Sequence, residues 1–292
     1  MCALAQSTLA IGPTAGLPLA LQRALDPGRD FERMPTPGPS DWLSNHPEPG
    51  QTYEQFLDSH PGRPDARRHR LYIQPLGDFS GLDCPSLDQL REFAAAFFTL
   101  DVSMLPTLDL AQVDITSRLH PATGGLQLLT TSILKLLRHR VPADGFALVA
   151  ITMIDLYPEP AWNFVFGQAA VHHRVGVYSF ARYDPRFYGQ RPSTDSHQLM
   201  LRRSCKVVAH EAGHLFQIDH CIWYHCLMNG SNHIAEADAR PLHLCPVVLR
   251  KLRWSIGFDV VERYQRLWKF AEQAGFEDEA RWLDHRLRFI TA

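Results

Sequence analysis

The chain lacks several features that would place it at a membrane or on nucleic acid. No stretch of its 292 residues reaches about 18 consecutive apolar side chains, so no membrane-spanning helix is expected. The first 25 residues contain no Lys or Arg before Arg23, and Gly12-Pro13 and Gly16-Leu17-Pro18 interrupt them, unlike a secretory signal peptide. A net charge of −2 leaves no electrostatic footprint for DNA, RNA or anionic lipid. We therefore expect an intracellular protein, cytoplasmic and perhaps also nuclear, that binds neither nucleic acid nor membrane.

Composition and local pattern predict one large domain with flanking segments. A 45% hydrophobic content supports a substantial core, and we expect a monomer. Prolines and glycines alternate without period from Pro27 to Pro64, which is typical of an extended arm. We predict an N-terminal arm over 1–65, partly disordered, a domain over 66–258 and a helical C-terminal tail over 259–292. A role for the arm as an interaction module has only weak support, because such arms are mostly linkers.

Apolar periodicity predicts alternating strands and helices, which indicates an α/β (α+β) fold. The unbroken apolar run Phe146–Ile154 is typical of a central strand buried on both faces. A further helix is expected to begin in Ser193–Ser196, a run of good N-cap residues, and to continue to Leu215. The other expected strands are Leu71–Leu76, Gln112–Leu119, Asn163–Ala170 and Gly176–Tyr183. The other expected helices are Pro85–Leu100, Leu126–Arg138, and a helical pattern over 236–254 and 260–290.

The sequence HEAGHLFQIDH carries the strongest chemical signal. His210 and His214 are four residues apart, so both imidazoles leave one helix face and can reach one ion, with Glu211 beside them. His220 can join them only if the helix ends near Phe216 and the chain folds back. Three protein ligands leave a fourth position open to water, which zinc acidifies to a pKa of roughly 7. A chance HExxH sequence is the competing interpretation, but the third histidine makes coincidence improbable.

Three of the six cysteines follow this motif closely, at Cys221, Cys226 and Cys245. Without a secretory context, thiolate ligands are more plausible here than disulfide partners. A metal-free cluster of reduced thiols is the alternative.

The motif and its surroundings resemble the archaemetzincins, a metzincin-like family of zinc peptidases whose pattern runs HExxHxxGxxHC, four residues, C, x, M, and a later CxxC. The matching positions are His210, Glu211, His214, His220, Cys221, Cys226, Met228 and Cys245. The likeness extends over about residues 40 to 260, through segments such as VGVYSFARY and CLMNGSNHIAEADARPL.

This resemblance implies a metzincin-like zincin fold, with a mixed twisted sheet, an active-site helix and a helical C-terminal flank. It implies that Met228 forms the hydrophobic floor of the metal site, the Met-turn. It also implies that Val177, Tyr178 and Ser179 lie in an edge strand that binds an extended peptide by strand addition. A plain structural edge is the competing interpretation.

Two positions depart from the family pattern. Gln217 replaces a glycine, so it must adopt the left-handed conformation at a cost of roughly 1 kcal/mol, or the turn must be built differently. Val248 stands where the family has the fourth cysteine that would help hold a second, structural zinc. His243 or His225 could replace that ligand, since Cys₃His is an ordinary zinc set.

We therefore predict a zinc metallopeptidase in which Glu211 is the general base. By resemblance, we expect it to cleave small peptides, possibly as an aminopeptidase. The alternative is a catalytically impaired, zinc-stabilised binding protein. Retention of Glu211 argues against that alternative, because a structural zinc has no use for this carboxylate.

Overall fold

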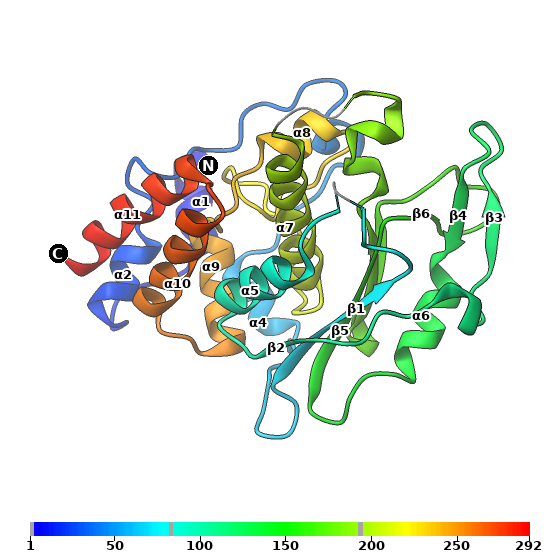
Figure 1. Ribbon diagram of the computed structural model, residues 1–292. Helices are drawn as coiled ribbons and strands as arrows, with labels where there is room; N and C mark the ends of the chain where they lie inside the picture. Colours follow the sequence, from blue (N-terminus) through cyan, green and yellow to red (C-terminus); the bar gives the residue numbers. More distant parts are fainter. Residues whose placement is uncertain (1–2, 82–83, 192–194) are drawn as a thin grey trace. The chain divides into compact units, whose positions relative to one another are not determined.

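The computed structural model describes residues 3–81, 84–191 and 195–292 (Figure 1). It divides into two compact units. The first unit comprises residues 1–63, 96–99 and 216–292, and the second comprises residues 64–95 and 100–215. No helix in the described ranges is both long and apolar enough to cross a membrane.

A five-stranded mixed sheet forms the centre of the second unit. Its order is β2(Val102–Met104), β1(Arg70–Leu76), β5(Gly145–Thr152), β8(Val175–Ser179) and β7(Gly167–Ala170). The first four strands are parallel, and β7 runs antiparallel to β8. Every residue of β5 is buried, as its unbroken apolar sequence predicts. The mixed sheet of the predicted fold class is confirmed.

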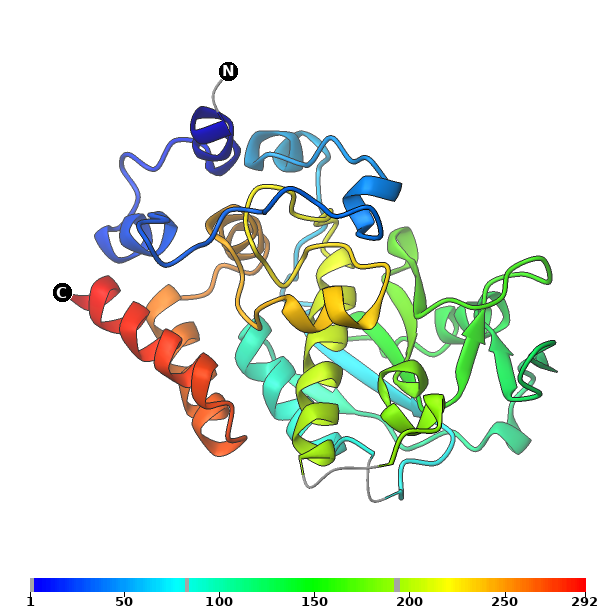
Figure 2. The same ribbon diagram turned by 90° about the horizontal axis from the view of Figure 1, so that it is seen from above.

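Two helices cover opposite faces of this sheet (Figures 1 and 2). Helix α6(Thr130–Arg138) places Ile133 and Leu137 in one apolar cluster with Val175 and Val177 of β8. Helix α7(Ser196–His214) packs against β5, β7 and β8 from the other side. Because strand side chains alternate between faces, the side chain of Tyr178, which follows Val177 in β8, points towards α7.

A small second sheet lies in the same unit. Here the expected strand over 112–119 and the expected helix over 126–138 are only partly correct. Its order is β3(Ser117–Leu119), β4(Leu126–Leu129) and β6(Asp155–Tyr157). The expected strand over 112–119 is shorter, because residues 110–112 form the 3₁₀ helix η1(Leu110–Gln112). The expected helix over 126–138 begins only at Thr130, since residues 126–128 pair with β3 across a hairpin. A short leucine-rich run satisfies strand and helix patterns equally well.

Short 3₁₀ helices interrupt the region between β7 and α7. The expected strand over 176–183 ends at Ser179, whose Oγ accepts a hydrogen bond from the Ala181 N–H at 3.0 Å. Of the expected strand over 163–170, only Gly167–Ala170 forms a strand, and Val165 makes an isolated bridge with Leu156. The 3₁₀ helices are η2(Val171–His173), η3(Ala181–Tyr183) and η4(Pro185–Tyr188). In the predicted N-cap run, residues 193 and 194 lie outside the described ranges, and α7 begins at Ser196.

The first unit is helical. Helices α10(Val260–Gln273) and α11(Glu277–Thr291) run side by side as the expected helical hairpin, turning through Gly275 with φ of +71° (Figure 1). The other helices of this unit are α1(Ala3–Ile11), α2(Leu19–Leu25), α3(Trp42–Asn45), α4(Tyr53–Asp58), α8(Ile234–Ala239) and α9(Pro246–Ile256). Helix α5(Leu87–Phe98) is divided between the units, with its residues up to 95 in the second unit and the remainder in the first.

The N-terminal arm is tied to the C-terminal helices rather than hanging free. Arg286 is 1% exposed, pairs with the Asp30 carboxylate at 2.6 Å and donates to the carbonyls of Arg23, Ala24 and Asp26. Phe56 is fully buried and its ring packs edge-on against Trp254. Proline and glycine are frequent here because the chain turns repeatedly between short helices.

Candidate metal centres and active site

Helix α7 presents the two histidines of the HExxH motif side by side. Their Nε2 atoms lie 3.1 Å apart, and the rings are almost perpendicular, at 86°. Two imidazoles that bind one tetrahedral zinc at about 2.0–2.1 Å place their nitrogens roughly 3.3 Å apart. The observed pair therefore fits a shared zinc ion. Glu211, between them in the sequence, is only half-buried, as is His214, whereas His210 is 5% exposed.

The chain turns sharply just after α7. The helix ends at His214, and Gln217 has a φ of +63°, so of the two alternatives left open for this residue the chain takes the left-handed conformation. Gln51 holds the turn from both sides: its Nε2 donates to the Gln217 carbonyl at 3.1 Å, and its Oε1 accepts from the Asp219 N–H at 3.3 Å. The buried Lys251 ammonium in turn donates to the backbone carbonyl and the side chain of Gln51. Neither Gln51 nor Lys251 was identified from the sequence.

His220 follows the turn and is held by the N-terminal arm. Its Nδ1 lies 2.8 Å from Glu48 Oε1, which also accepts a hydrogen bond from Trp42 Nε1 at 2.7 Å. The Trp42 ring packs edge-on against the imidazole at 5.3 Å. Because a carboxylate accepts, Nδ1 carries the proton and Nε2 remains available as a metal ligand. The sequence analysis assigned no role to Glu48, which lies in the proline-rich segment HPEPG.

Met228 lies in a tightly bonded loop. Its side chain is buried, and its carbonyl accepts from the Cys221 N–H at 2.8 Å. Asn229 closes the loop by accepting from the Cys226 N–H and donating to the carbonyls of Cys221 and Tyr224. The Met-turn role of Met228 stays a prediction.

The three predicted cysteines form a compact buried cluster within the first unit. The sulfurs of Cys221, Cys226 and Cys245 all lie within 4.8 Å of one another, and those of Cys221 and Cys245 are 3.4 Å apart. Burial opposes ionisation of Cys221, but hydrogen bonds from the other two thiols and from backbone N–H groups outweigh it, so its pKa lies well below the usual value. Burial raises the pKa of Cys226 and of Cys245. The cluster is thus arranged around one thiolate.

The structure does not bring His243 into this cluster. Its Nδ1 lies 2.9 Å from Glu279, and its ring stacks on Trp282 at 3.5 Å. His225, the other candidate fourth ligand, lies 4.0 Å from Glu32 and also stands outside the group of three sulfurs. Val248 is buried in the first turns of α9 and cannot ligate. The donor set of the cluster is three thiols without a fourth protein ligand in the described residues.

A third group of metal-ligand side chains, Asp41, His233 and Glu236, was not identified from the sequence. His233 Nδ1 accepts from the Glu236 N–H at 3.2 Å, so Nε2 carries the proton and faces Asp41 Oδ1 at 3.3 Å. Glu236 in turn accepts from the Trp42 N–H at 2.9 Å. A protonated Nε2 cannot bind a metal. We interpret the group as a hydrogen-bond network that joins α3 to α8.

The predicted edge strand is corrected by the sheet order. Val177, Tyr178 and Ser179 lie in β8, which pairs with β5 on one side and β7 on the other and is fully buried. The outer strand on this side is β7, whose residues are all partly exposed. The family resemblance implied an edge strand here, but the position of a strand in a sheet is set by non-local pairing.

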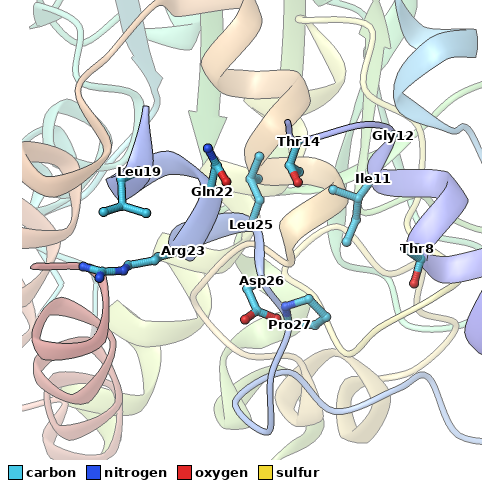
Figure 3. A pocket seen from close by; sticks show the side chains of 10 residues that line it. All are labelled: Thr8, Ile11, Gly12, Thr14, Leu19, Gln22, Arg23, Leu25, Asp26 and Pro27. Atoms are coloured by element: carbon cyan, nitrogen blue, oxygen red, sulfur yellow. The ribbon is translucent and has the colours of Figure 1, made fainter. Parts of the chain in front are cut away.

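A cavity of about 420 Å³ opens between α1 and α2 of the first unit (Figure 3). Its charged lining residues are Arg23, which donates a hydrogen bond to the Ile290 carbonyl, and Asp26, which accepts one from the Gly28 N–H. No catalytic group predicted from the sequence lines it.

Comparison with known proteins places these residues in a family. The model of peptidase family M54 matches residues 128–254. Archaemetzincin-2 from Pongo abelii is 39% identical over 281 residues, covering 87% of this chain and 78% of that protein. Archaemetzincin-1 from Mus musculus is 37% identical over 279 residues, covering 85% of this chain and 55% of that protein.

One solved structure shares the fold. It is a zinc-dependent peptidase from Methanocorpusculum labreanum, with a TM-score of 0.50 and 23% identity, covering 62% of this chain and 99% of that chain. The match to archaemetzincin-2, which covers most of both chains, shows that the chain belongs to the archaemetzincin family of zinc metallopeptidases.

Proposed function

We propose that the chain hydrolyses peptide bonds with one zinc ion held by His210, His214 and His220 and with Glu211 as general base. The observation that carries the proposal is the convergence of the His210 and His214 Nε2 atoms, 3.1 Å apart on the helix that also carries Glu211. Such a spacing between two basic nitrogens is stabilised when both point at one cation.

The geometry around His220 supports it as the third ligand. It follows His214 by six positions, and the left-handed turn at Gln217 falls between them. The Glu48 carboxylate fixes the Nδ1–H tautomer and leaves Nε2 for the metal, an arrangement that raises the basicity of a ligating imidazole. Three histidines leave one position for water or substrate, as in catalytic rather than structural zinc sites.

Zinc in such a site acidifies water and polarises a peptide carbonyl. Glu211 follows His210 directly and is half-buried, so its carboxylate would be available to a water activated by the zinc. As general base, it would accept a proton from that water and deliver the proton to the leaving amine.

We propose that the substrate is a small peptide, bound in extended form beside β7. This strand pairs with β8 on one side only, and no described strand pairs with its other side. Its outer N–H and C=O groups can therefore hydrogen-bond an added strand. The family resemblance favours cleavage near the amino terminus.

The test is cleavage of a peptide library by the purified, zinc-loaded chain. We expect turnover that a chelator abolishes and added zinc restores. Matched peptides with free and acetylated amino termini then report on aminopeptidase action, which requires a preference for the free amine. Stoichiometric zinc without turnover would instead support the zinc-stabilised binding protein.

For the cysteine cluster we infer a metal-free state at low zinc concentration. The three thiols do not form a closed tetrahedral zinc site, because neither His243 nor Val248 supplies a fourth ligand.

A further inference from the structure

Tyr178 lies in an unusual slot on the sheet face that carries α7. The side chains of Val175 and Val177 pack with α6. Because side chains alternate between the two faces of β8, the Tyr178 ring points to the opposite face. The ring lies flat over two glycines. A Cβ atom at Gly167 would approach Tyr178 Cδ1 to 2.0 Å, and one at Gly176 would approach the Tyr178 hydroxyl to 2.3 Å. The absence of side chains at both positions therefore makes room for this tyrosine.

The hydroxyl of Tyr178 lowers the stability of the fold. The Tyr178 side chain is fully buried, and its hydroxyl has no hydrogen-bond partner among the described residues. A buried polar group without a partner destabilises the fold. A phenylalanine would fill the same slot without that cost, so packing alone does not account for the hydroxyl.

A charged group that acts on this hydroxyl belongs to the proposed active site. Burial raises the pKa of Tyr178 far above its usual value, and the negative charge of Glu211 raises it further. Helix α7, which carries Glu211, packs directly on β8. The phenol therefore stays protonated and can serve only as a neutral hydrogen-bond donor towards a carboxylate.

We propose that Tyr178 is a positioning residue for Glu211, donating a hydrogen bond to its carboxylate across one ordered water. This inference rests on the proposed role of Glu211 as general base. The bond holds the carboxylate in one orientation for proton transfer, while the flat seat on Gly167 and Gly176 fixes the phenol itself. Proton transfer depends on such orientation, because a base must lie within hydrogen-bond reach of the proton that it removes.

The test is Tyr178→Phe in the zinc-loaded full-length chain. We expect kcat to fall about tenfold with KM and zinc content unchanged, which is the range for loss of one hydrogen bond to a charged group. The melting temperature of the zinc-free protein should stay equal or rise, because the change removes an unpartnered buried hydroxyl. A structural tyrosine would show the reverse, with a lower melting temperature and an unchanged kcat.

Tyr72→Phe is the matched control. Tyr72 is buried in the same sheet but belongs to the apolar cluster on the α6 face, and its hydroxyl donates to Asp144 at 2.8 Å. The same atom is removed, so we expect a lower melting temperature and wild-type kcat.

Wild type and Glu211→Ala are measured in the same assay. If these two differ and Tyr178→Phe keeps wild-type kcat, the positioning role is overturned and the peptidase function stands. If wild type is no more active than Glu211→Ala, the proposed function fails, and the positioning role fails with it.

Discussion

The histidine pair on α7 and the cysteine cluster after it are two sets of metal ligands close in sequence but opposite in character. His214 and Glu211 are half-buried, and a carboxylate lies beside the imidazoles. The side chains of Cys221, Cys226 and Cys245 are almost fully buried, and backbone N–H groups and the buried Lys251 ammonium lie near their sulfurs. A catalytic zinc needs an open coordination position and a nearby proton acceptor, whereas a structural zinc needs four protein ligands. The first group meets its requirement, and the second lacks one ligand.

The largest expected effect comes from removing a histidine of the first group. His214→Ala should lose the bound zinc and, with it, measurable peptide cleavage, since two imidazoles hold zinc far more weakly than three. Zinc per chain by elemental analysis and the cleavage rate are measured together. His197→Ala, an exposed histidine on the same helix, is the control and should keep both. Full zinc content in His214→Ala would contradict the ligand assignment.

Glu211→Gln separates chemistry from binding at the same site. The amide cannot accept a proton, so kcat should fall by roughly 10² to 10⁴ while zinc content stays at the wild-type value. Steady-state kinetics and elemental analysis on one preparation give both numbers. A variant that keeps its wild-type rate would show that another group is the general base.

Val248→Cys should convert the second group into a closed site. The family pattern has a cysteine at this position, so a fourth thiolate there should add about one zinc per chain. With free zinc at 100 times the dissociation constant, the free energy of unfolding should rise by about 2.7 kcal/mol. The comparison is with Val247→Cys, an equally buried neighbour on α9, which should bind no extra zinc. Equal zinc in wild type and Val248→Cys would mean that the three thiols already hold a metal.

Gln217→Gly tests the turn between α7 and His220, with the smallest expected effect. Glycine adopts φ near +63° without the penalty of a side chain, so the free energy of unfolding should rise by about 1 kcal/mol. Gln217→Ala keeps the penalty and should give no such gain. Chemical denaturation of all three proteins measures the difference. A loss of stability with glycine would show that side-chain contacts of Gln217 outweigh its backbone strain.

The sequence was sufficient for features that depend on local spacing. The zinc helix, the central strand Gly145–Thr152 and the left-handed residue at Gln217 follow from periodicity or from a motif a few residues long. The helical hairpin at the C-terminus follows in the same way.

What was missed depends on contacts between distant parts of the chain. Glu48 meets His220 across 172 positions, and Gln51 meets Gln217 across 166. No local pattern marks either residue, and the proline-rich composition around them suggested only a linker. The error over β8 has the same origin, because strand order is set by pairing partners and not by alternation within one strand.

The most direct test of the central claim is X-ray absorption at the zinc edge of chain loaded with one equivalent of zinc. We predict a first shell of nitrogen and oxygen only, with imidazole scattering from three histidines at about 2.0–2.1 Å. A shell dominated by sulfur at about 2.3 Å would contradict the account, because the ion would then belong to the cysteine cluster.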